Sequence, residues 1–313
     1  MRWAKGSTPT VRTSLCLLCL VALVTGCRRP SAPPVARPAS PRQEVTLRDQ
    51  AGRLVKLPAY VQRIVSLAPS TTETLFALGV GDRVVGVTSV CNYPPEAKQR
   101  PKVGDFRQSV ERILSLDPDL VVAVADLQSD IVRQLDRTGA PLLVIDPYTF
   151  DDLYTAIRLV GKATGAQKQA ESLVRGIQEA RNSVRQAAAR LPEAQKPKVF
   201  IEIGDQPLRT AGPNTFVSQI VEDAGGRNIG ADVRSDWGTF SHEALIARNP
   251  DVIITTISGD VDDILHRDGW STIAAVKTGR VYAVNPDLVV RPGPRLKQGL
   301  ETVFEVLHPG EKP

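Results

Sequence analysis

The sequence predicts an α/β protein with two Rossmann-like lobes joined by a single long, rigid helix. In each half of the chain, short apolar strands alternate with helical segments, which is typical of a parallel sheet covered by helices on both faces. A long helical pattern over 151–192 separates the halves, and one sequence motif occurs in both of them. The body of about 270 residues, with 42% hydrophobic content overall, is large enough for two ordinary domains.

The N-terminal segment predicts export. Basic residues precede an apolar run over 15–24, and the small residues Thr25 and Gly26 stand directly before Cys27. That order is typical of a secretory signal peptide, and the run is too short for a spanning helix, which needs about 20 apolar residues. The residues up to Cys27 resemble a bacterial lipobox, so we expect removal of residues 1–26 and a lipid anchor on Cys27. The alternative is an ordinary signal peptide with a chance cysteine near its end.

Residues 27–43 predict an extended tether. They are rich in Pro and basic residues and contain no large apolar side chain beyond one Val, so they have little to bury. Residues 1–43 also account for the basic charge of the chain. They hold seven of its 39 Lys and Arg and no acid, which leaves 32 basic against 34 acidic residues, a balance of −2. The charge therefore gives no reason to expect nucleic-acid binding.

Residues 44–150 predict the N-terminal lobe. Residues 44–57 alternate around the turn 49–52 as in a β-hairpin, and a buried strand at 63–67 leads into an apolar helix at 74–78 that Gly79 closes. The alternation continues with strands at 84–88, 120–125 and 142–146 and helices at 110–116 and 129–138.

The segment 151–192 predicts the connecting helix, interrupted mainly at Gly161 and Gly165. A rigid helical joint limits hinge motion, so we expect small movements of the lobes on ligand binding. Residues 193–313 predict the C-terminal lobe. Its expected strands are 199–204, 252–257 and 281–284, and its expected helices are 216–223, 241–248 and 294–307.

An internal repeat relates the two lobes. Residues 109–122 (SVERILSLDPDLVV) align without gaps on residues 241–254 (SHEALIARNPDVII). Each copy starts with a capping Ser, has Glu111 or Glu243 in the first helical turn, and reaches Pro-Asp before a buried strand. Each Glu therefore lies at the start of a surface helix, where it either caps the helix and nothing more or presents its charge to a partner.

Cysteine and histidine usage limits the chemistry. Cys16 and Cys19 leave with the signal peptide and Cys27 is consumed by the lipid, so only Cys91 remains and no intrachain disulfide is possible. Cys91 is either a small buried hydrophobe or a ligand contact. The three histidines have no companion at metal-ligand spacing, so we expect no metal site built on His and Cys.

The chain contains no catalytic motif. The Gly-x-Gly-x-x-Gly and Walker patterns are absent, and Ser70 lacks both a Gly-x-Ser-x-Gly elbow and an obvious His partner, so we expect no enzyme. In open α/β sheets, ligands bind outside the carboxyl ends of the strands. The expected loops there carry aromatic, amide and Arg side chains, which together form a polar cleft; they are 69–72, 91–94, 104–106, Asp126, Arg209, 236–237 and 287–295.

Five segments carry a resemblance to a known family: RIVSLAPSTTETLFALG (63–79), VVGVTSVCNYPPEA (84–97), KVGDF (102–106), VERILSLDPDLVVA (110–123) and DLVVRPGPR (287–295). They resemble the periplasmic binding proteins of the cobalamin and iron-siderophore type, most of all the cobalamin-binding branch. The resemblance covers residues from about 44 to 308. It implies a monomer without a cofactor of its own that faces the periplasm or the cell exterior. Such a protein holds a ligand between its lobes and delivers it to an ABC importer, which consists of a permease dimer and its ATPase.

The same resemblance favours docking over capping for the repeated glutamates. In this family a surface glutamate on each lobe pairs with arginines of the permease, and the matching positions are Glu111 and Glu243. Two carboxylates on two lobes can dock on a two-fold permease through charge-assisted bonds.

The ligand positions of the family carry over less completely. Trp237 matches a ligand-stacking tryptophan of the cobalamin binder, and Asp287 and Arg291 match its acid and base at the rim of the cleft. Other aromatic positions of that binder hold Val90, Val124, Arg209 and the smaller Phe106. The expected ligand contacts are Ser70, Thr72, Cys91, Asn92, Tyr93, Phe106, Arg209, Trp237, Asp287 and Arg291.

A corrinoid such as cobalamin is the first expected cargo. Its face would rest on Trp237, Phe106 and the valines, while Arg209 and Arg291 bond its peripheral carbonyls. A ferric siderophore or haem is the alternative, because an anionic metal chelate would bind the same arginines. A surface sensor or an enzyme on the same fold is the third hypothesis.

Overall fold

The computed structural model describes residues 44–105, 107–125, 128–257 and 261–313. The chain divides into a unit of residues 1–41 and a unit of residues 42–313, and every element described below belongs to the second. The expected signal peptide, Cys27 and the tether lie outside the described residues. Within the described ranges, no helix is both long enough and apolar enough to cross a membrane.

The second unit begins with the predicted hairpin. Strand β1 (Glu44–Arg48) pairs antiparallel with β2 (Leu54–Pro58), and Gly52 adopts a φ of +80° in the turn between them. Glycine suits that turn because a left-handed backbone conformation is strained for residues with a Cβ atom. Leu47 and Leu57 point from the hairpin into the core.

The N-terminal lobe contains a four-stranded parallel sheet in the order β4-β3-β5-β6. The central strands are buried along their whole length, which explains their nearly continuous apolar runs. Helix α1 begins at Pro69 rather than at the expected residue 74, because proline is pre-organised for the first helical position. The elements of this lobe are β3 (Ile64–Ser66), α1 (Pro69–Ala77), η1 (Gly81–Arg83), β4 (Val84–Val87), η2 (Pro95–Gln99), α2 (Val110–Ser115), β5 (Leu120–Val124), α3 (Ser129–Thr138) and β6 (Leu142–Ile145).

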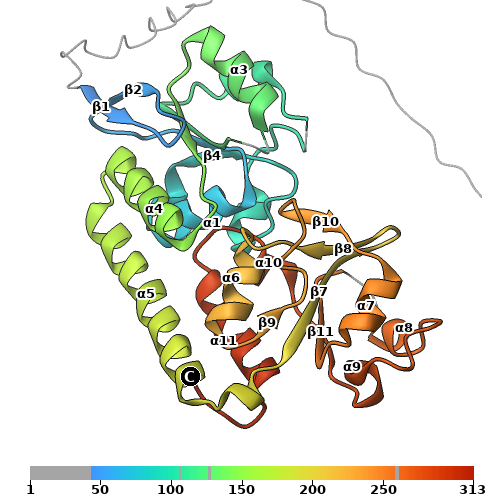
Figure 1. Cartoon of the computed structure of the whole chain (residues 1–313). Helices are drawn as coiled ribbons and strands as arrows, with labels where there is room; N and C mark the ends of the chain where they lie inside the picture. The colour runs from blue at the N-terminus through green and yellow to red at the C-terminus, as the bar shows by residue number, and fades with distance from the viewer. Residues whose placement is uncertain (1–43, 106, 126–127, 258–260) are drawn as a thin grey trace, which may run out of the picture. The chain divides into compact units, whose positions relative to one another are not determined.

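The helical segment expected over 151–192 consists of two helices, α4 (Phe150–Thr164) and α5 (Gln167–Arg190). They are separated at Gly165, whose φ of +75° ends α4 in the left-handed conformation that is common at helix ends. The single long helix that joins the lobes is α5. It packs against α4 near the N-terminal lobe and against α6 (Phe216–Asp223) and α11 (Leu296–Leu307) of the C-terminal lobe, as Figure 1 shows.

The C-terminal lobe contains a six-stranded sheet in the order β10-β8-β7-β11-β12, with β9 also paired to β7. Strands β7 (Lys198–Asp205), β11 (Val252–Thr255) and β12 (Val281–Ala283) are parallel, as predicted, and the short strand β9 (Arg227–Asn228), which the sequence did not indicate, is parallel to β7. The sheet also has an antiparallel edge that the sequence did not indicate, made of β8 (Leu208–Ala211) and β10 (Trp237–Thr239). The prediction of loops at Arg209 and Trp237 is therefore wrong, because both residues lie on these short edge strands. The remaining elements are η4 (Glu193–Gln195), α7 (His242–Arg248), α8 (Val261–Leu265), α9 (Ala274–Lys277) and α10 (Pro286–Val289).

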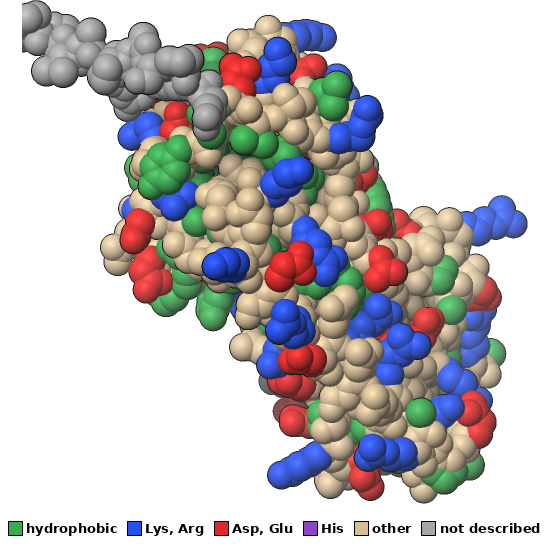
Figure 2. All heavy atoms as spheres, turned by 90° about the vertical axis from the view of Figure 1, so that its left-hand side faces the viewer, with side chains coloured by type: hydrophobic (Ala, Val, Ile, Leu, Met, Phe, Trp, Pro, Cys, Tyr) green, Lys and Arg blue, Asp and Glu red, His purple; other side chains and the backbone are tan. Residues whose placement is uncertain are grey.

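The two lobes share one apolar core that runs along α5. A single cluster of buried side chains extends from Leu57 in the hairpin through Val174 on α5 to Phe304 on α11. Separate clusters cover the other face of each sheet. Figure 2 shows the surface that carries α4 and α5, where side chains of both charge signs are interspersed. The continuous core resists displacement of one lobe relative to the other.

Candidate functional site

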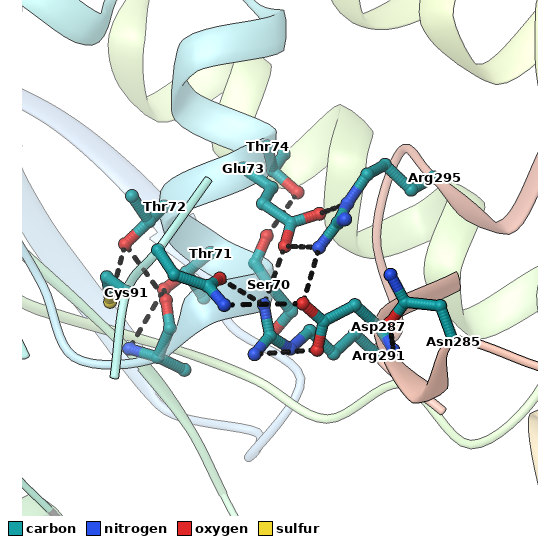
Figure 3. A network of polar contacts seen from close by, with 12 residues as sticks. Ser70, Thr71, Thr72, Glu73, Thr74, Cys91, Asn285, Asp287, Arg291 and Arg295 are labelled. Atoms are coloured by element: carbon teal, nitrogen blue, oxygen red, sulfur yellow. Dashed lines mark hydrogen bonds and ion pairs between the residues drawn. The ribbon is translucent and has the colours of Figure 1, made fainter. Parts of the chain in front are cut away.

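The lobes are bonded to each other by a cluster of charged and amide side chains, which we call the interlobe network (Figure 3). It consists of Glu73 and Asn92 from the N-terminal lobe and Asp287, Arg291 and Arg295 from the C-terminal lobe. The Glu73 carboxylate accepts hydrogen bonds from Arg295 Nε at 2.8 Å, Arg295 Nη2 at 2.7 Å and Arg291 Nη1 at 3.1 Å.

Charge is balanced within the interlobe network. Asp287 Oδ1 lies 2.8 Å from Arg291 Nη2, and Asp287 Oδ2 lies 3.3 Å from Arg295 Nη2, so two guanidinium groups face two carboxylates. The side chain of Glu73 is only 1% exposed, and burying a charged side chain this far is costly unless oppositely charged partners and hydrogen bonds compensate for the lost hydration. The pKa of Arg295 lies above its ordinary value, first because Glu73 accepts its hydrogen bonds.

Three of the expected ligand contacts, Asn92, Asp287 and Arg291, are brought together in this network. Asn92 Oδ1 accepts from Arg291 Nη1 at 2.8 Å, and Asn92 Nδ2 donates to Asp287 Oδ2 at 3.4 Å. Tyr93 is next to them, because the Arg295 guanidinium lies 4.3 Å from the centre of its half-exposed ring, a cation–π contact. These polar groups are held in place by contacts from both lobes.

Thr72 and Cys91 lie below the surface, in contrast to the expectation of ligand contact. Thr72 is 0% exposed and Cys91 is 1% exposed, and Thr72 Oγ1 donates to Cys91 Sγ at 3.1 Å. The hydroxyl of Thr88 lies at the same distance from the sulfur. Of the two alternatives for Cys91, the small buried side chain is the one observed. Thr72 and Cys91 therefore support the loop that presents Asn92.

Ser70 is also almost fully buried. Its carbonyl accepts from Thr74 Oγ1 at 2.8 Å, and Gly293 of the other lobe packs against it and against Glu73. Ser70 therefore lies where α1 meets the C-terminal lobe.

Arg209 and Trp237 form a second group, on the neighbouring strands β8 and β10. Thr239 is the register partner of Arg209, and Arg209 Nη2 donates to the backbone carbonyl of Trp237 at 3.0 Å. The indole side chain is 38% exposed, which is unusual for a residue of its size. An exposed indole ring can stack on a planar ligand, and a guanidinium bonded to the backbone of the same residue can bond polar groups of that ligand.

Val124 and Phe106 were also expected to offer apolar surface to the ligand. Val124 is 7% exposed and belongs to the buried strand β5, so it offers a ligand little surface. Phe106 lies outside the described residues.

A hollow of about 560 Å³ borders the interlobe network on α1 and the start of α11. It is lined by Glu73, Phe76, Tyr93, Arg100 and Arg295, among other residues. Among the described residues, Tyr93 is the only expected ligand contact that lines it. The hollow is therefore distinct from the group of Arg209 and Trp237.

The repeated glutamates are exposed and ionised. The pKa of Glu111 lies below its ordinary value, first because Ser109 Oγ donates to its carboxylate at 2.7 Å and second because its own backbone amide donates. The pKa of Glu243 is lowered by its own backbone amide first and by the Ser241 hydroxyl second. The serines cap the helices by accepting from the backbone three residues on, so the outward carboxylate faces are available to a partner.

Glu73 and Arg295 were not among the expected ligand contacts, although Arg295 ends the loop 287–295 that was expected to border the cleft. Their only signals were a Glu in the first turns of the helix after a Pro-Ser-Thr-Thr run and an Arg at the end of the loop 287–295. Among the described residues, no group of three His, Cys, Asp or Glu side chains is placed to hold a metal ion.

Two α/β lobes joined by one helix, with polar and aromatic side chains at their junction, define a two-lobed solute-binding protein. Residues 64–288 match the periplasmic binding protein family. The uncharacterized ABC transporter substrate-binding lipoprotein YvrC of Bacillus subtilis (strain 168) is 37% identical over 301 residues, covering 94% of this chain and 95% of YvrC. A cobalamin-binding protein of Halobacterium salinarum (strain ATCC 29341 / DSM 671 / R1) is 32% identical over 278 residues, 84% of this chain and 74% of that protein.

A solved structure is similar as well. The apo form of the periplasmic heme-binding protein RhuT from Roseiflexus sp. RS-1 superimposes with a TM-score of 0.71 at 32% identity, covering 79% of this chain and 98% of RhuT. This chain therefore belongs to the periplasmic binding protein family, the solute-binding proteins of ABC transporters, whose members are not enzymes.

Proposed function

We propose that this chain captures a corrinoid such as cobalamin between its two lobes and delivers it to an ABC importer. The observation that carries the proposal is that Arg209 on β8 bonds the backbone carbonyl of the exposed Trp237 on the adjacent strand β10. A corrin ring offers a broad apolar face to the indole and peripheral amide carbonyls to the guanidinium. The cobalamin-binding relative supports this choice of cargo.

The interlobe network supplies the polar rim in this proposal. Asn92 and Arg291 are held together across the lobes and still carry exposed polar surface that a ligand's amides can reach. Asp287 fixes Arg291, so the guanidinium is already oriented before the ligand arrives. Such preorganisation reduces the entropy lost on binding.

We further propose that a lipid on Cys27 anchors the protein on the outer side of the membrane, so that it faces the periplasm or the cell exterior. The lipobox-like sequence and the lipoprotein relative support this anchor. A tethered binder raises the local concentration of loaded protein at its permease. Metabolic labelling with a radioactive fatty acid tests it, and labelling that persists in Cys27→Ser would contradict it.

Calorimetric titration of the purified mature protein with cyanocobalamin tests the cargo. We expect saturable heat and quenching of Trp237 fluorescence, and we expect Trp237→Ala to weaken binding by about tenfold to a hundredfold, since aromatic stacking contributes about 1–3 kcal/mol. Tyr60→Ala is the matched control, because Tyr60 is an exposed aromatic residue on the N-terminal lobe that is not part of the site. The absence of heat with every corrinoid tested would exclude a corrinoid cargo.

Haem or a ferric siderophore is the second candidate cargo. The exposed guanidinium of Arg209 favours it, because an anionic chelate gains a charge-assisted bond there. The heme-binding structural relative adds support. If haem or a ferric siderophore displaces cyanocobalamin or quenches Trp237 where cyanocobalamin does not, the cargo changes while the importer role remains.

A further inference from the structure

Two exposed aliphatic side chains occupy equivalent positions of the internal repeat. In the described ranges, Leu54, Leu114 and Ile246 are the exposed Leu and Ile side chains, and the last two are 40% and 37% exposed. Leu114 follows Glu111 by three residues on α2, and Ile246 follows Glu243 by three residues on α7. Residues three apart are neighbours on a helix surface, so each lobe presents a carboxylate next to an aliphatic side chain.

The helices that carry these pairs are held in the same way in both lobes. Each is capped at its start by Ser109 or Ser241, and the residue directly before each exposed aliphatic side chain, Ile113 or Leu245, is completely buried. In each helix, the side chain of Ile113 or Leu245 is therefore buried in the lobe, and the next side chain points to the solvent. The same helix orientation results in both lobes.

The ends of the two helices are also equivalent. Asp117 and Asn249 are the non-glycine residues with positive φ in the described chain, at +45° and +46°, and they occupy the same repeat position. Two residues later, the Asp119 carboxylate accepts from the backbone amides of Gln62 and Arg63, and the Asp251 carboxylate accepts from that of Lys198.

These bonds join the segment that follows each helix to the start of its lobe's central strand. The amides of Asp119 and Asp251 each donate back to that strand's start at 2.8 Å, to the carbonyls of Arg63 and Lys198. The two copies of the repeat therefore hold their surface pairs, Glu111 with Leu114 and Glu243 with Ile246, in the same way.

We propose that Leu114 and Ile246 are the apolar half of a docking element on each lobe. Its partner is a two-fold permease dimer in which each subunit offers an apolar socket beside a cationic side chain. The proposal rests on the proposed function, and it is continuous with the Glu111 and Glu243 docking pair. An aliphatic side chain left exposed at the same position in both lobes gains free energy only when a partner covers it.

The two halves of the element have different kinetic roles. Charges at the rim of an interface accelerate association and make it sensitive to salt, because they steer the encounter. Apolar side chains that become buried mainly slow dissociation. The carboxylates thus select and orient the permease, and Leu114 and Ile246 prolong the complex.

Binding rates on the permease–ATPase complex of the same organism, held in nanodiscs, test this division. We expect Leu114→Gln with Ile246→Gln to raise the dissociation rate about 25-fold, about fivefold per site, with association and its salt dependence unchanged. We expect Glu111→Gln with Glu243→Gln to lower the association rate and its salt dependence. Leu54→Gln is the matched control for an exposed leucine outside the repeat.

The outcomes separate the two proposals. If the unsubstituted protein does not bind the permease, the importer role fails and this inference fails with it. If it binds and the Leu114→Gln, Ile246→Gln protein dissociates like the unsubstituted protein, only the apolar docking element is overturned. Unchanged cyanocobalamin binding and an unchanged Tm confirm that the variants are folded, and Leu114→Ala with Ile246→Ala repeats the test without adding an amide.

Discussion

We expect Glu73→Ala to lower the free energy of unfolding by about 3 kcal/mol, because it removes the central carboxylate of the interlobe network. Glu73 accepts three hydrogen bonds from Arg291 and Arg295, whose side chains are 21% and 11% exposed. Breaking a buried ion pair by removing one partner costs about 3–5 kcal/mol. The lower end applies because Asp287 still bonds both arginines in the variant.

Urea unfolding, followed by Trp fluorescence and circular dichroism, measures this loss. Glu305→Ala is the matched control, because Glu305 is an exposed glutamate on α11. A double-mutant cycle with Arg295→Ala isolates the direct term between Glu73 and Arg295. A loss below about 1 kcal/mol, which is typical of an exposed ion pair, would refute the view that the network holds the lobes together.

Two further predictions concern pH. We expect Ser109→Ala with Ser241→Ala to raise the pKa of Glu111 and Glu243, because each serine hydroxyl stabilises the carboxylate. If the two carboxylates dock on the permease as proposed, binding is then lost at a higher pH than in the unsubstituted protein, and a pH series of association rates that shows no shift would contradict this. For His308, burial lowers the pKa, and Nε2 lies 2.7 Å from the Ala224 carbonyl. The unfolded state therefore binds more protons, so stability falls as the pH drops below about 6.5. We expect His308→Gln to flatten that decline in Tm, and an unchanged slope would show that other groups cause it.

The sequence was sufficient for the repeated, strongly patterned elements. The parallel strands and the helices of the repeat appear where apolar runs and capping residues predicted them, because those signals are local. The antiparallel edge was missed, since β8 and β10 are short and carry exposed residues such as Arg209 and Trp237. In the connecting segment, the sequence indicated interruptions at both Gly161 and Gly165, and only Gly165 ends a helix, because it has the positive φ while Gly161 lies inside α4.

The candidate site was less predictable, for a different reason. Glu73 and Arg295 are 222 residues apart in sequence, and their pairing depends on how two lobes meet, which no local pattern records. Thr72 and Cys91, in contrast, were expected to contact the ligand but are buried. Thr72 lies in the first turn of α1 and Cys91 in the loop before Asn92, but both side chains turn inward and bond to Ser66 and Thr88 inside the lobe.

The bonds of Asp119 and Asp251 have a consequence for transport. In each lobe, the segment that follows the helix of Glu111 or Glu243 is bonded to the chain at the start of the central strand, so we expect this helix and its sheet to move together. A change in the separation of the Glu111 and Glu243 carboxylates therefore reports a displacement of the lobes themselves. If the permease binds both carboxylates at a fixed spacing, as proposed, it distinguishes one arrangement of the lobes from another. It does so without contacting the cargo.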